Sequence, residues 1–322
     1  MNNRILVLGG SGFVGRHLVE HLHRQGVRVT VPTRRRDAAP WLWSLPRVDV
    51  RRADATDPAA LRVLLPGHDA VVNLIAVLHG DARRFEQVHV ALPRQLAAAC
   101  AASGVRRLVH VSALGAAADG PSLYQRSKAQ GEAVLRQAAA DGALALTLLR
   151  PSVMYGSGDR LLNLFAGLQR VFPLIPLACA EARFQPVWVR DVAQALVRCL
   201  QDNATAGRSY ELCGPEVWTL RELVRAAGVW AGVRGGRGRP IIGLPAALGR
   251  LQALAMEWLP GEPLMSRDNL DSMRVDNVAS GQLPGLAELG ITPAPLSAVG
   301  PMILGPDHPA ARLDAYRRGA GR

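Results

Sequence analysis

A glycine-rich turn directly after the first apolar run constrains this chain more than any other feature of its sequence. The run Arg4–Leu8 is typical of a buried strand, and it leads into Gly9-Gly10-Ser11-Gly12-Phe13-Val14-Gly15 and then an amphipathic helical pattern. Glycines at such a junction permit a tight turn and let a ligand approach the backbone N–H groups at the start of the helix. The spacing is Gly-x-x-Gly-x-x-Gly rather than Gly-x-Gly-x-x-Gly, and a plain turn is the alternative. The position favours a pyrophosphate site, and the residues expected to hold it are Gly9, Gly12, Phe13, Val14 and Gly15.

Short apolar runs alternate with stretches of helical period through the first half of the chain, which predicts an α/β fold with a Rossmann-type, doubly wound parallel sheet. The expected strands are Arg4–Leu8, Val27–Val31, Val48–Arg51, Ala70–Leu74, Leu108–Val111 and Ala145–Leu149. The expected helices are Phe13–Gln25, Pro58–Leu64, Arg84–Ser103 and Leu123–Ala140. Residues 1–150 are therefore interpreted as a dinucleotide-binding domain.

The composition shifts toward proline and glycine after Arg150-Pro151, so residues 151–322 are interpreted as an irregular substrate-side region, partly interleaved with the first domain. Two helices are still expected there. One begins near Asp191 as its N-cap, and the other begins at Thr219, where Glu222 three residues on completes a capping box.

A third helix is expected over Ala246–Leu259, and it places one apolar face opposite Arg250 and Glu257. The residues of that face are Leu248, Leu251, Ala255 and Trp258. The preferred interpretation is that this face packs on the core, and the alternative is a helix lying on a membrane surface.

The net charge of +12 favours an anionic partner, and a phosphorylated cofactor, nucleic acid and an acidic membrane surface all qualify. No motif of nucleic-acid recognition accompanies the charge, so a nucleic-acid partner is not expected. The four cysteines form no Cys-x-x-Cys pair, which fits a reducing compartment. The first apolar run is too short for a signal peptide and no segment is long enough to span a bilayer. A cytoplasmic protein is predicted, soluble or at most peripheral to the inner face of the membrane.

The end of the second expected strand bears on the choice of cofactor. A site selective for NAD(H) carries an acidic residue there for the ribose 2′-hydroxyl, whereas this chain has Thr33 followed by Arg34 and Arg35. Arginine pairs well with a 2′-phosphate, so NADP(H) is preferred, NAD(H) remains open, and a solvated basic turn is the alternative. Asp54, after the third strand, is a candidate for the adenine edge or equally a cap of the next helix.

Tyr124 and Lys128 stand four residues apart on an expected helix, so their side chains share one face. There the ammonium can lower the pKa of the phenol and bond ribose hydroxyls. Of the 38 basic residues, Lys128 is the only lysine. A compact ammonium is not interchangeable with a guanidinium where space is tight, so this exception favours a functional pair.

His17-Leu18-Val19-Glu20-His21 matches the His-x-x-Glu-His pattern of certain zinc proteases. The sequence suggests no third ligand, and the segment follows the glycine turn on a helix with a solvated outer face. No metal site is therefore expected.

Three motifs then occur in a specific order: the Gly9–Gly15 turn, Tyr124-x-x-x-Lys128 and the segment Leu149–Gly156 with sequence LRPSVMYG. With them the chain resembles the extended short-chain dehydrogenase/reductase superfamily, also called the NAD-dependent epimerase/dehydratase superfamily, over nearly its whole length. Its atypical branch contains the accessory alpha-subcomplex 9 subunit of respiratory complex I and bacterial relatives described as nucleoside-diphosphate-sugar epimerases. The segments similar to that branch are Val71–Ile75, Val109–Leu114, Phe172–Leu177 and Gln185–Val192.

The resemblance implies Tyr124 as acid/base and Lys128 as its orienting cation, with both also holding the nicotinamide ribose. The serine that polarises the substrate carbonyl in active members falls at Ala113, so Ser112 beside it is the remaining candidate. The helix asparagine of the superfamily falls at His89. The further residues that the resemblance implies for cofactor binding are Ala55, Leu74, Ile75, Ala76, Pro151 and Ser152.

Two functions follow from these observations. The first is an NADP(H)-binding protein of the complex I accessory-subunit type, associated with quinone or membrane, whose nucleotide is structural or a sensor. The second is an active NADP-dependent reductase or a nucleoside-diphosphate-sugar epimerase or dehydratase that uses Tyr124 and Lys128. The corresponding partners are a dinucleotide, a quinone or sugar-nucleotide substrate, and a respiratory complex.

Overall fold

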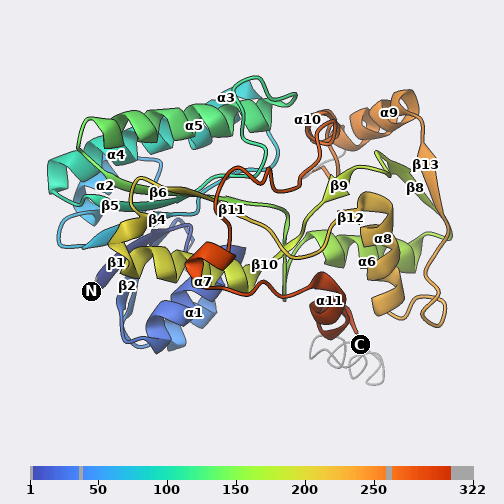
Figure 1. Cartoon of the computed structure of the whole chain (residues 1–322), viewed down its shortest axis with the longest axis horizontal. Helices are drawn as coiled ribbons and strands as arrows, with labels where there is room; N and C mark the ends of the chain where they lie inside the picture. Colours follow the sequence, from blue (N-terminus) through green and yellow to red (C-terminus); the bar gives the residue numbers. More distant parts are fainter. Residues whose placement is uncertain (1–2, 36–38, 259–262, 306–322) are drawn as a thin grey trace. The chain divides into compact units, whose positions relative to one another are not determined.

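The computed structural model describes residues 3–35, 39–258 and 263–305, and the chain forms two compact units (Figure 1). The first unit comprises the residues up to Pro151 together with Val189–Leu212 and Ala279–Thr292. The second comprises Ser152–Trp188, Cys213–Val278 and the residues from Pro293 onward. The chain thus passes between the units several times.

A seven-stranded parallel sheet forms the centre of the first unit, with strand order β11-β6-β5-β4-β1-β2-β3. Strands β4 and β5 are buried at every position, which is expected where helices cover both faces of a parallel sheet. This is the Rossmann-type α/β architecture, and the predicted fold class is confirmed. The strands are β1 Arg4–Leu8, β2 Arg28–Thr33, β3 Val48–Arg52, β4 Ala70–Asn73, β5 Arg107–Val111, β6 Ala145–Pro151 and β11 Ser209–Leu212.

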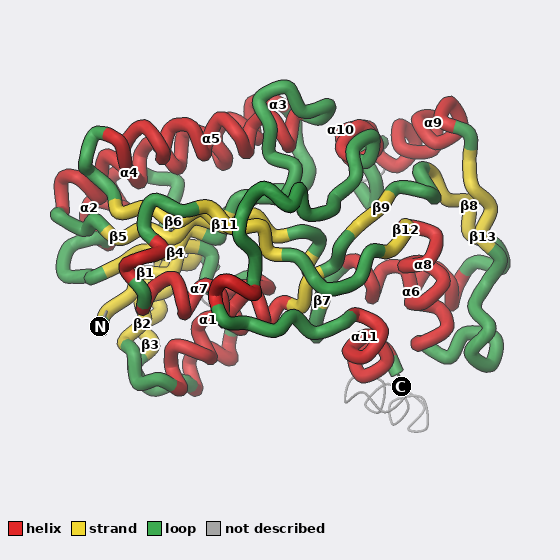
Figure 2. The backbone as a smooth tube through the Cα atoms, in the orientation of Figure 1, coloured by secondary structure: helices red, strands yellow, loops and turns green. Residues whose placement is uncertain are grey.

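Helices cover both faces of this sheet (Figures 1 and 2). Helices α1 and α7 pack against each other on one face, and α2, α4 and α5 pack side by side on the other. The helices are α1 Phe13–Arg24, α2 Pro58–Leu64, α3 Ala82–Phe85, α4 Leu92–Ser103, α5 Leu123–Ala140 and α7 Val189–Gln201. Short helical turns are η2 Pro40–Ser44, η4 Asn203–Thr205 and η5 Ala287–Leu289.

The predicted helix Arg84–Ser103 is wrong in one respect, because its first part is not a regular α-helix. Between α3 and α4 the backbone forms a π-helical turn, η3, over Glu86–Ala91. The turn brings the backbone of His89 so close to α5 that a Cβ at Gly131 would overlap the His89 carbonyl oxygen. Such turns occur frequently at functional sites.

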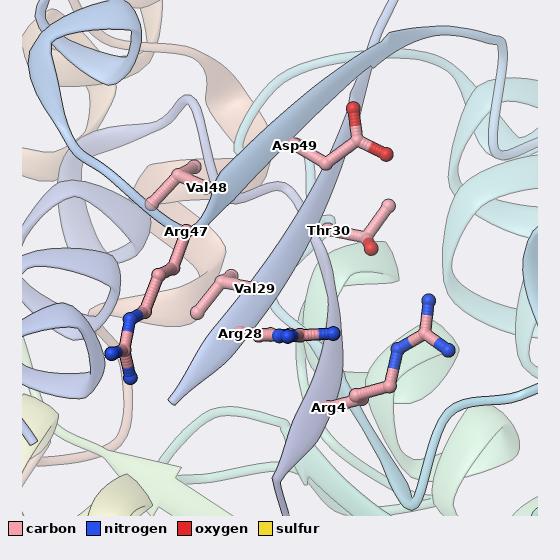
Figure 3. Close-up of a pocket in the computed structure, with 7 residues that line it drawn as sticks. All are labelled: Arg4, Arg28, Val29, Thr30, Arg47, Val48 and Asp49. Carbon is pink, nitrogen blue, oxygen red and sulfur yellow. The ribbon is translucent and has the colours of Figure 1, made fainter. Parts of the chain in front are cut away.

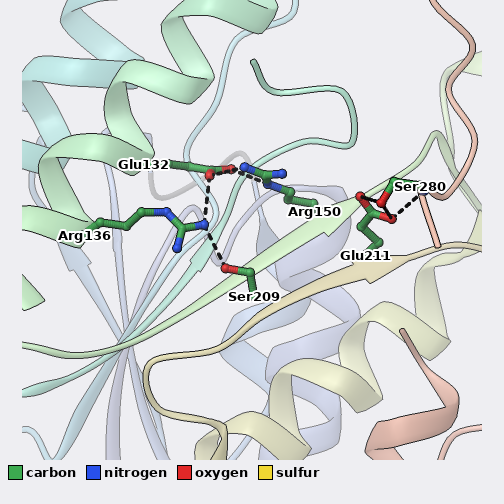
Figure 4. Close-up of polar contacts among 6 residues, drawn as sticks. All are labelled: Glu132, Arg136, Arg150, Ser209, Glu211 and Ser280. Carbon is green, nitrogen blue, oxygen red and sulfur yellow. Dashed lines mark hydrogen bonds and ion pairs between the residues drawn. The ribbon is translucent and has the colours of Figure 1, made fainter. Parts of the chain in front are cut away.

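A buried ion-pair group holds α5 to the edge of the sheet (Figure 4). The Glu132 carboxylate, 3% exposed, accepts hydrogen bonds from Arg150 on β6 at 2.9 and 2.6 Å. Arg136, one helical turn from Glu132, donates to Ser209 on β11 at 2.9 Å. Two strands and a helix are therefore joined by one charged group.

The segment Ala279–Thr292 is attached to the other end of β11. Its Ser280 donates from the backbone N–H at 2.7 Å and from the hydroxyl at 3.0 Å to the carboxylate of Glu211 (Figure 4). These contacts explain why a segment from the end of the chain belongs to the first unit.

The second unit is built from short strands and packed helices. Helices α6 and α8 pack together, and the strands pair as β10 with β7, β12 with β9 and β13 with β8. The strands are β7 Met154–Tyr155, β8 Ile175–Ala178, β9 Arg183–Phe184, β10 Val187–Trp188, β12 Trp218–Thr219 and β13 Ile241–Leu244. The helices are α6 Leu161–Val171, α8 Leu220–Trp230, α9 Ala246–Glu257, α10 Arg267–Ser272 and α11 Leu296–Leu304.

The two helix starts predicted in this half of the sequence have different outcomes. The capping box of Thr219 and Glu222 is present at the start of α8, which confirms that prediction. Asp191 is not an N-cap, because α7 begins at Val189 directly after β10 and Asp191 lies in its first turn. A carboxylate there still interacts favourably with the helix dipole, which accounts for the misleading signal.

The preferred interpretation of α9 is wrong. Its small residues Gly249 and Ala253 are buried, and Gly249 lies against Ala178 of β8. The predicted apolar face is exposed instead, with Leu248 52% and Leu251 62% exposed. The predicted end at Leu259 lies outside the described residues.

No helix within the described ranges is both long enough and apolar enough to cross a bilayer.

Candidate functional site

The glycine turn lies at the carboxyl end of β1 and starts α1. Gly9 has φ +80°, a left-handed backbone that favours glycine. Gly12 is the N-cap of α1 and supplies no side-chain cap. The first N–H groups of the helix, those of Phe13, Val14 and Gly15, therefore receive no side-chain cap, and the N-terminus of a helix in this state favours an anionic ligand.

Gly15 shows why this turn tolerates no side chain. A Cβ there would lie 2.5 Å from the carbonyl oxygens of Gly9 and Gly10, whereas one at Gly12 would lie 3.2 Å from the Gly9 carbonyl oxygen. Gly10 is equally confined, because a Cβ would lie 2.9 Å from Val31 of β2. These glycines therefore form the tight backbone turn that a pyrophosphate-binding site requires.

Thr33 ends β2 and is buried, whereas Arg34 and Arg35 are exposed. The Thr33 hydroxyl donates to the Arg35 carbonyl oxygen at 3.1 Å and accepts from the Arg35 N–H at 3.3 Å. It therefore shapes the turn and leaves the two guanidinium groups in solvent, where a 2′-phosphate could meet them.

Asp54 lies in an exposed turn after β3. Its carboxylate accepts from the N–H and hydroxyl of Thr56 at 2.9 and 2.7 Å, and the backbone bond is the main reason that its pKa is lowered. The cap of α2 is Asp57, which accepts from Ala59 N–H, so Asp54 is not that cap. Ala55 beside it is 6% exposed and packs in the core.

Leu74, Ile75 and Ala76 follow β4 at the same edge of the sheet as the glycine turn. A Cβ at Gly9 would lie 3.2 Å from Leu74 and 3.3 Å from Ile75, so this loop and the turn are in contact. Pro151 ends β6 in the same unit. Ser152 belongs to the second unit, where its hydroxyl donates to the Asn277 side chain at 2.6 Å.

Tyr124 and Lys128 lie on α5, whose start is fixed by a capping box between Ser122 and Gln125. The Lys128 ammonium is 2% exposed and donates to the Val111 carbonyl oxygen at 3.0 Å. Burial lowers the pKa of Lys128 to about 8.

Burial raises the pKa of Tyr124 to about 12, which is opposite to the lowering expected from the spacing of the pair. The phenol is therefore neutral at physiological pH and can donate a proton or a hydrogen bond. Desolvation at this position outweighs any effect of the neighbouring cation on the phenol.

His89, in the π-helical turn, joins the loop after β4 to α5. Its Nε2 accepts from the Val77 N–H at 3.2 Å, so Nδ1 carries the proton and donates to the Ser127 hydroxyl at 2.8 Å. The Ser127 hydroxyl in turn donates to the carbonyl oxygen of Tyr124 at 2.9 Å. Burial, followed by repulsion from Lys128, lowers the pKa of His89 to about 3, so the ring is neutral.

Aromatic rings surround Tyr124 on this side. Phe85 stacks on His89 at 5.5 Å, and both rings meet Tyr124 edge to face. The resemblance singles out His89, at the position of the superfamily's helix asparagine, but no sequence pattern predicts how these rings are arranged.

Ser112 and Ala113 follow β5 and are both buried. Within the described residues, the Ser112 hydroxyl has no hydrogen-bond partner. A buried hydroxyl without a partner is costly, so it marks a place where a ligand or water is expected to bind. Ala113 offers no polar group at the neighbouring position.

A hollow of about 300 Å³ lies at the opposite, amino-terminal edge of the same sheet (Figure 3). Its residues include Arg4, Arg28 and Arg47. Nucleotides in open parallel sheets bind outside the carboxyl ends of the strands, so this hollow is distinct from the candidate nucleotide site at the glycine turn.

Two residues of the His-x-x-Glu-His pattern on α1 make contacts with neighbouring side chains. The His17 ring meets Phe13 edge to face at 5.9 Å, and Glu20 pairs with Arg24 at 2.6 Å. Over the described ranges, the acidic, histidine and cysteine side chains form no cluster that could hold a metal ion.

The sequence pattern of the NAD dependent epimerase/dehydratase family matches residues 5–213. The chain belongs to this family. The match covers the glycine turn and extends to the end of β11.

Two proteins that are similar to this chain in sequence have different names. The mouse protein NADH dehydrogenase (ubiquinone) 1 alpha subcomplex subunit 9, mitochondrial, is 32% identical over 305 residues, which are 90% of this chain and 76% of that protein. A ceramide reductase of Caulobacter vibrioides is 33% identical over 195 residues, which are 60% of this chain and 59% of that protein.

A solved structure shares the fold of this chain. The dTDP-glucose 4,6-dehydratase DesIV from Streptomyces venezuelae, solved with NAD and TYD bound, superimposes with a TM-score of 0.71 at 23% identity, covering 98% of this chain and 97% of DesIV.

Proposed function

We propose that this chain binds NADP(H) as a structural or sensory group and acts as an accessory component of the complex I type, at the inner, cytoplasmic face of a membrane. Its relatives named as complex I subunits match it over most of its length, which supports the placement. Arg34 and Arg35, exposed after β2, support the preference for NADP(H) over NAD(H).

The observation that carries the proposal is the contrast between a complete glycine turn and an incomplete set of polar groups around the reacting position. Glycines at 9, 12 and 15 allow a tight turn with no room for side chains, and the helix N-terminus that it forms suits a pyrophosphate. At the position where the resemblance implies the serine of active members, this chain has Ala113, and His89 is fixed as a neutral link between Val77 and Ser127.

The nicotinamide cofactor would supply a hydride donor or acceptor when bound. The chain's own residues would hold it: the N–H groups of the glycine turn at the pyrophosphate, Arg34 at the 2′-phosphate, and Tyr124 with Lys128 at the ribose hydroxyls. Such hydrogen bonds fix the nucleotide whether or not a substrate reacts.

A second candidate function is a reductase or sugar-nucleotide epimerase or dehydratase. The neutral phenol of Tyr124 and the unpartnered Ser112 hydroxyl favour it, since both could donate to a substrate oxygen. A quinone is a further proposed substrate, and it belongs with the first function, the accessory component of the complex I type.

Native mass spectrometry of the purified chain, combined with turnover assays, distinguishes the two functions. We expect NADP(H) to remain bound in one-to-one ratio, with no oxidation of added NADPH in the presence of quinone or carbonyl substrates. Replacing Tyr124 by Phe should then weaken retention by only about one hydrogen bond, roughly 1 kcal/mol. Steady NADPH oxidation that falls about 100-fold or more in Tyr124→Phe would instead establish the enzyme.

A further inference from the structure

Helix α9 presents an uncharged apolar face to its surroundings. Leu248, Leu251, Ala255 and Trp258 are all exposed, and Trp258, directly after the helix, is 83% exposed. At about 100° per residue these four side chains fall within an arc of roughly 80°. The helix packs on the second unit through its small residues, so its largest side chains are the ones left uncovered.

Further exposed apolar side chains lie on the strand that precedes α9 and on the segment before the strand that pairs with it. Ile242 on β13 is 52% exposed, and Val171 and Phe172, just before β8, are 73% and 50% exposed. Strands β8 and β13 pair in parallel, and α9 directly follows β13 (Figure 2). The helix and the two strands are therefore neighbours within the second unit, and each of α9, β13 and the segment before β8 carries exposed apolar side chains.

Positive charge accompanies these apolar side chains. The stretches 161–178 and 231–258 contain five arginines and one acidic residue, Glu257. Glu257 is already paired with Arg267 at 2.9 Å. Four of the arginines are Arg170, Arg234, Arg237 and Arg239, whereas the fifth, Arg250, lies opposite the apolar face of α9 and pairs with Asp271 at 3.7 Å.

The basic loop before β13 is held beside the apolar residues at the end of α6. The Arg239 N–H donates to Gln169 Oε1 at 2.7 Å, and its side chain donates to the Gln169 carbonyl oxygen at 3.2 Å. Arg170 and Val171 directly follow Gln169. The exposed cations are therefore adjacent to exposed apolar side chains.

We propose that this surface, made of α9, β13, the loop 232–239 and residues 170–174, docks on an anionic lipid bilayer. Leu248, Leu251 and Trp258 enter the headgroup region, where an amphipathic helix lies in the plane of the interface. The exposed side chains of Arg170, Arg234 and Arg237 contact lipid phosphates, each adding about a fivefold gain in partitioning. Tryptophan is favoured at this depth because its ring is apolar and its N–H is polar.

A bilayer fits these observations better than a second copy of the chain. Two copies joined through this surface would bring their exposed arginines together, and like charges repel, whereas the phosphates of an anionic bilayer attract them. The proposal deepens the membrane placement in the proposed function, but none of its residues belongs to the nucleotide site, so the two can fail separately.

Flotation of the full chain with lipid vesicles tests the surface. We expect binding to vesicles of phosphatidylcholine mixed with phosphatidylglycerol, weak binding to phosphatidylcholine alone, and a blue shift of tryptophan emission that Trp258→Phe removes. Leu251→Glu should reduce binding by roughly tenfold or more, because it places a charge on the inserted face. The matched control is Val63→Glu on α2. Val63 is 73% exposed in the first unit, and this substitution should leave binding unchanged.

The double variant Arg234→Gln, Arg237→Gln separates charge from apolar contact. It should lose about 25-fold in binding to the anionic vesicles and little to the neutral ones. Absence of vesicle binding, or equal binding by Leu251→Glu and Val63→Glu, would overturn the proposal. A dimer in solution that Leu251→Glu dissociates would overturn it in favour of a second copy. Circular dichroism and nucleotide retention show whether each variant remains folded.

Discussion

Replacing Lys128 by Met should change how the stability of the nucleotide-free protein depends on pH. Burial lowers the pKa of Lys128 to about 8, whereas the unfolded chain titrates near 10.5. Between these two values the unfolded chain binds the additional proton. Stability therefore rises as pH increases through this window, and the charged ammonium is a cost to folding below it.

The magnitude follows from the two pKa values. The cost is about 3 kcal/mol near pH 7 and falls to about 1 kcal/mol near pH 10, a change of roughly 2–3 kcal/mol. In Lys128→Met this contribution is absent. The difference in unfolding free energy between wild type and variant should therefore shift by that amount across the range, while contributions from other groups cancel.

Urea denaturation of both proteins without nucleotide, at a series of pH values, measures the difference. Arg62→Met, which removes an exposed cation on α2, is the control and should give a curve parallel to that of wild type. Parallel curves for Lys128→Met as well would refute the reasoning, because they would mean that the buried ammonium does not titrate in this window. If the ammonium also holds the cofactor ribose, nucleotide affinity of the wild type should fall above pH 8.

Three further outcomes are expected. Gly15→Ala should weaken dinucleotide retention by about tenfold or more, since its Cβ would lie 2.5 Å from backbone oxygens, and Gly12→Ala should do so less; equal affinities by calorimetry would contradict the role of the glycine turn. Arg34→Ala should remove an NADPH preference worth on the order of 1.5–3 kcal/mol, and wild type with equal affinities for NADPH and NADH would disprove the cofactor preference. Glu132→Gln should lower the free energy of unfolding by about 3 kcal/mol because Arg150 loses a buried partner, and a loss below about 1 kcal/mol in urea denaturation would show that the pair is dispensable.

The architecture of the first unit was predictable because the hydrophobic pattern of each segment there matches the burial of its residues in the fold. Strand β1 and helices α2 and α5 have the predicted bounds, and the glycine turn falls between β1 and α1. In a parallel sheet covered on both faces, strands are continuous apolar runs, and such runs are visible in a single sequence.

Other features depend on contacts between distant residues and were not predictable. The π-helical turn at His89 depends on the absence of a side chain at Gly131, more than forty residues away. The role of the His89 ring depends on Val77 and Ser127, which periodicity cannot place. For α9, periodicity correctly grouped Leu248 with Leu251, but it cannot tell whether a face points inward or outward.

The single lysine of the chain gives an unusual chemical handle. Because Lys128 carries the only ε-amino group and is 2% exposed, an amine-directed reagent can modify α5 at one position and only when the site opens. A pKa of about 8 leaves a useful share of that amine unprotonated and nucleophilic near neutral pH. The rate of acylation of the Lys128 peptide, followed by mass spectrometry, therefore reports how often the site opens. The same rate, measured with increasing dinucleotide, would report occupancy of the site without any turnover.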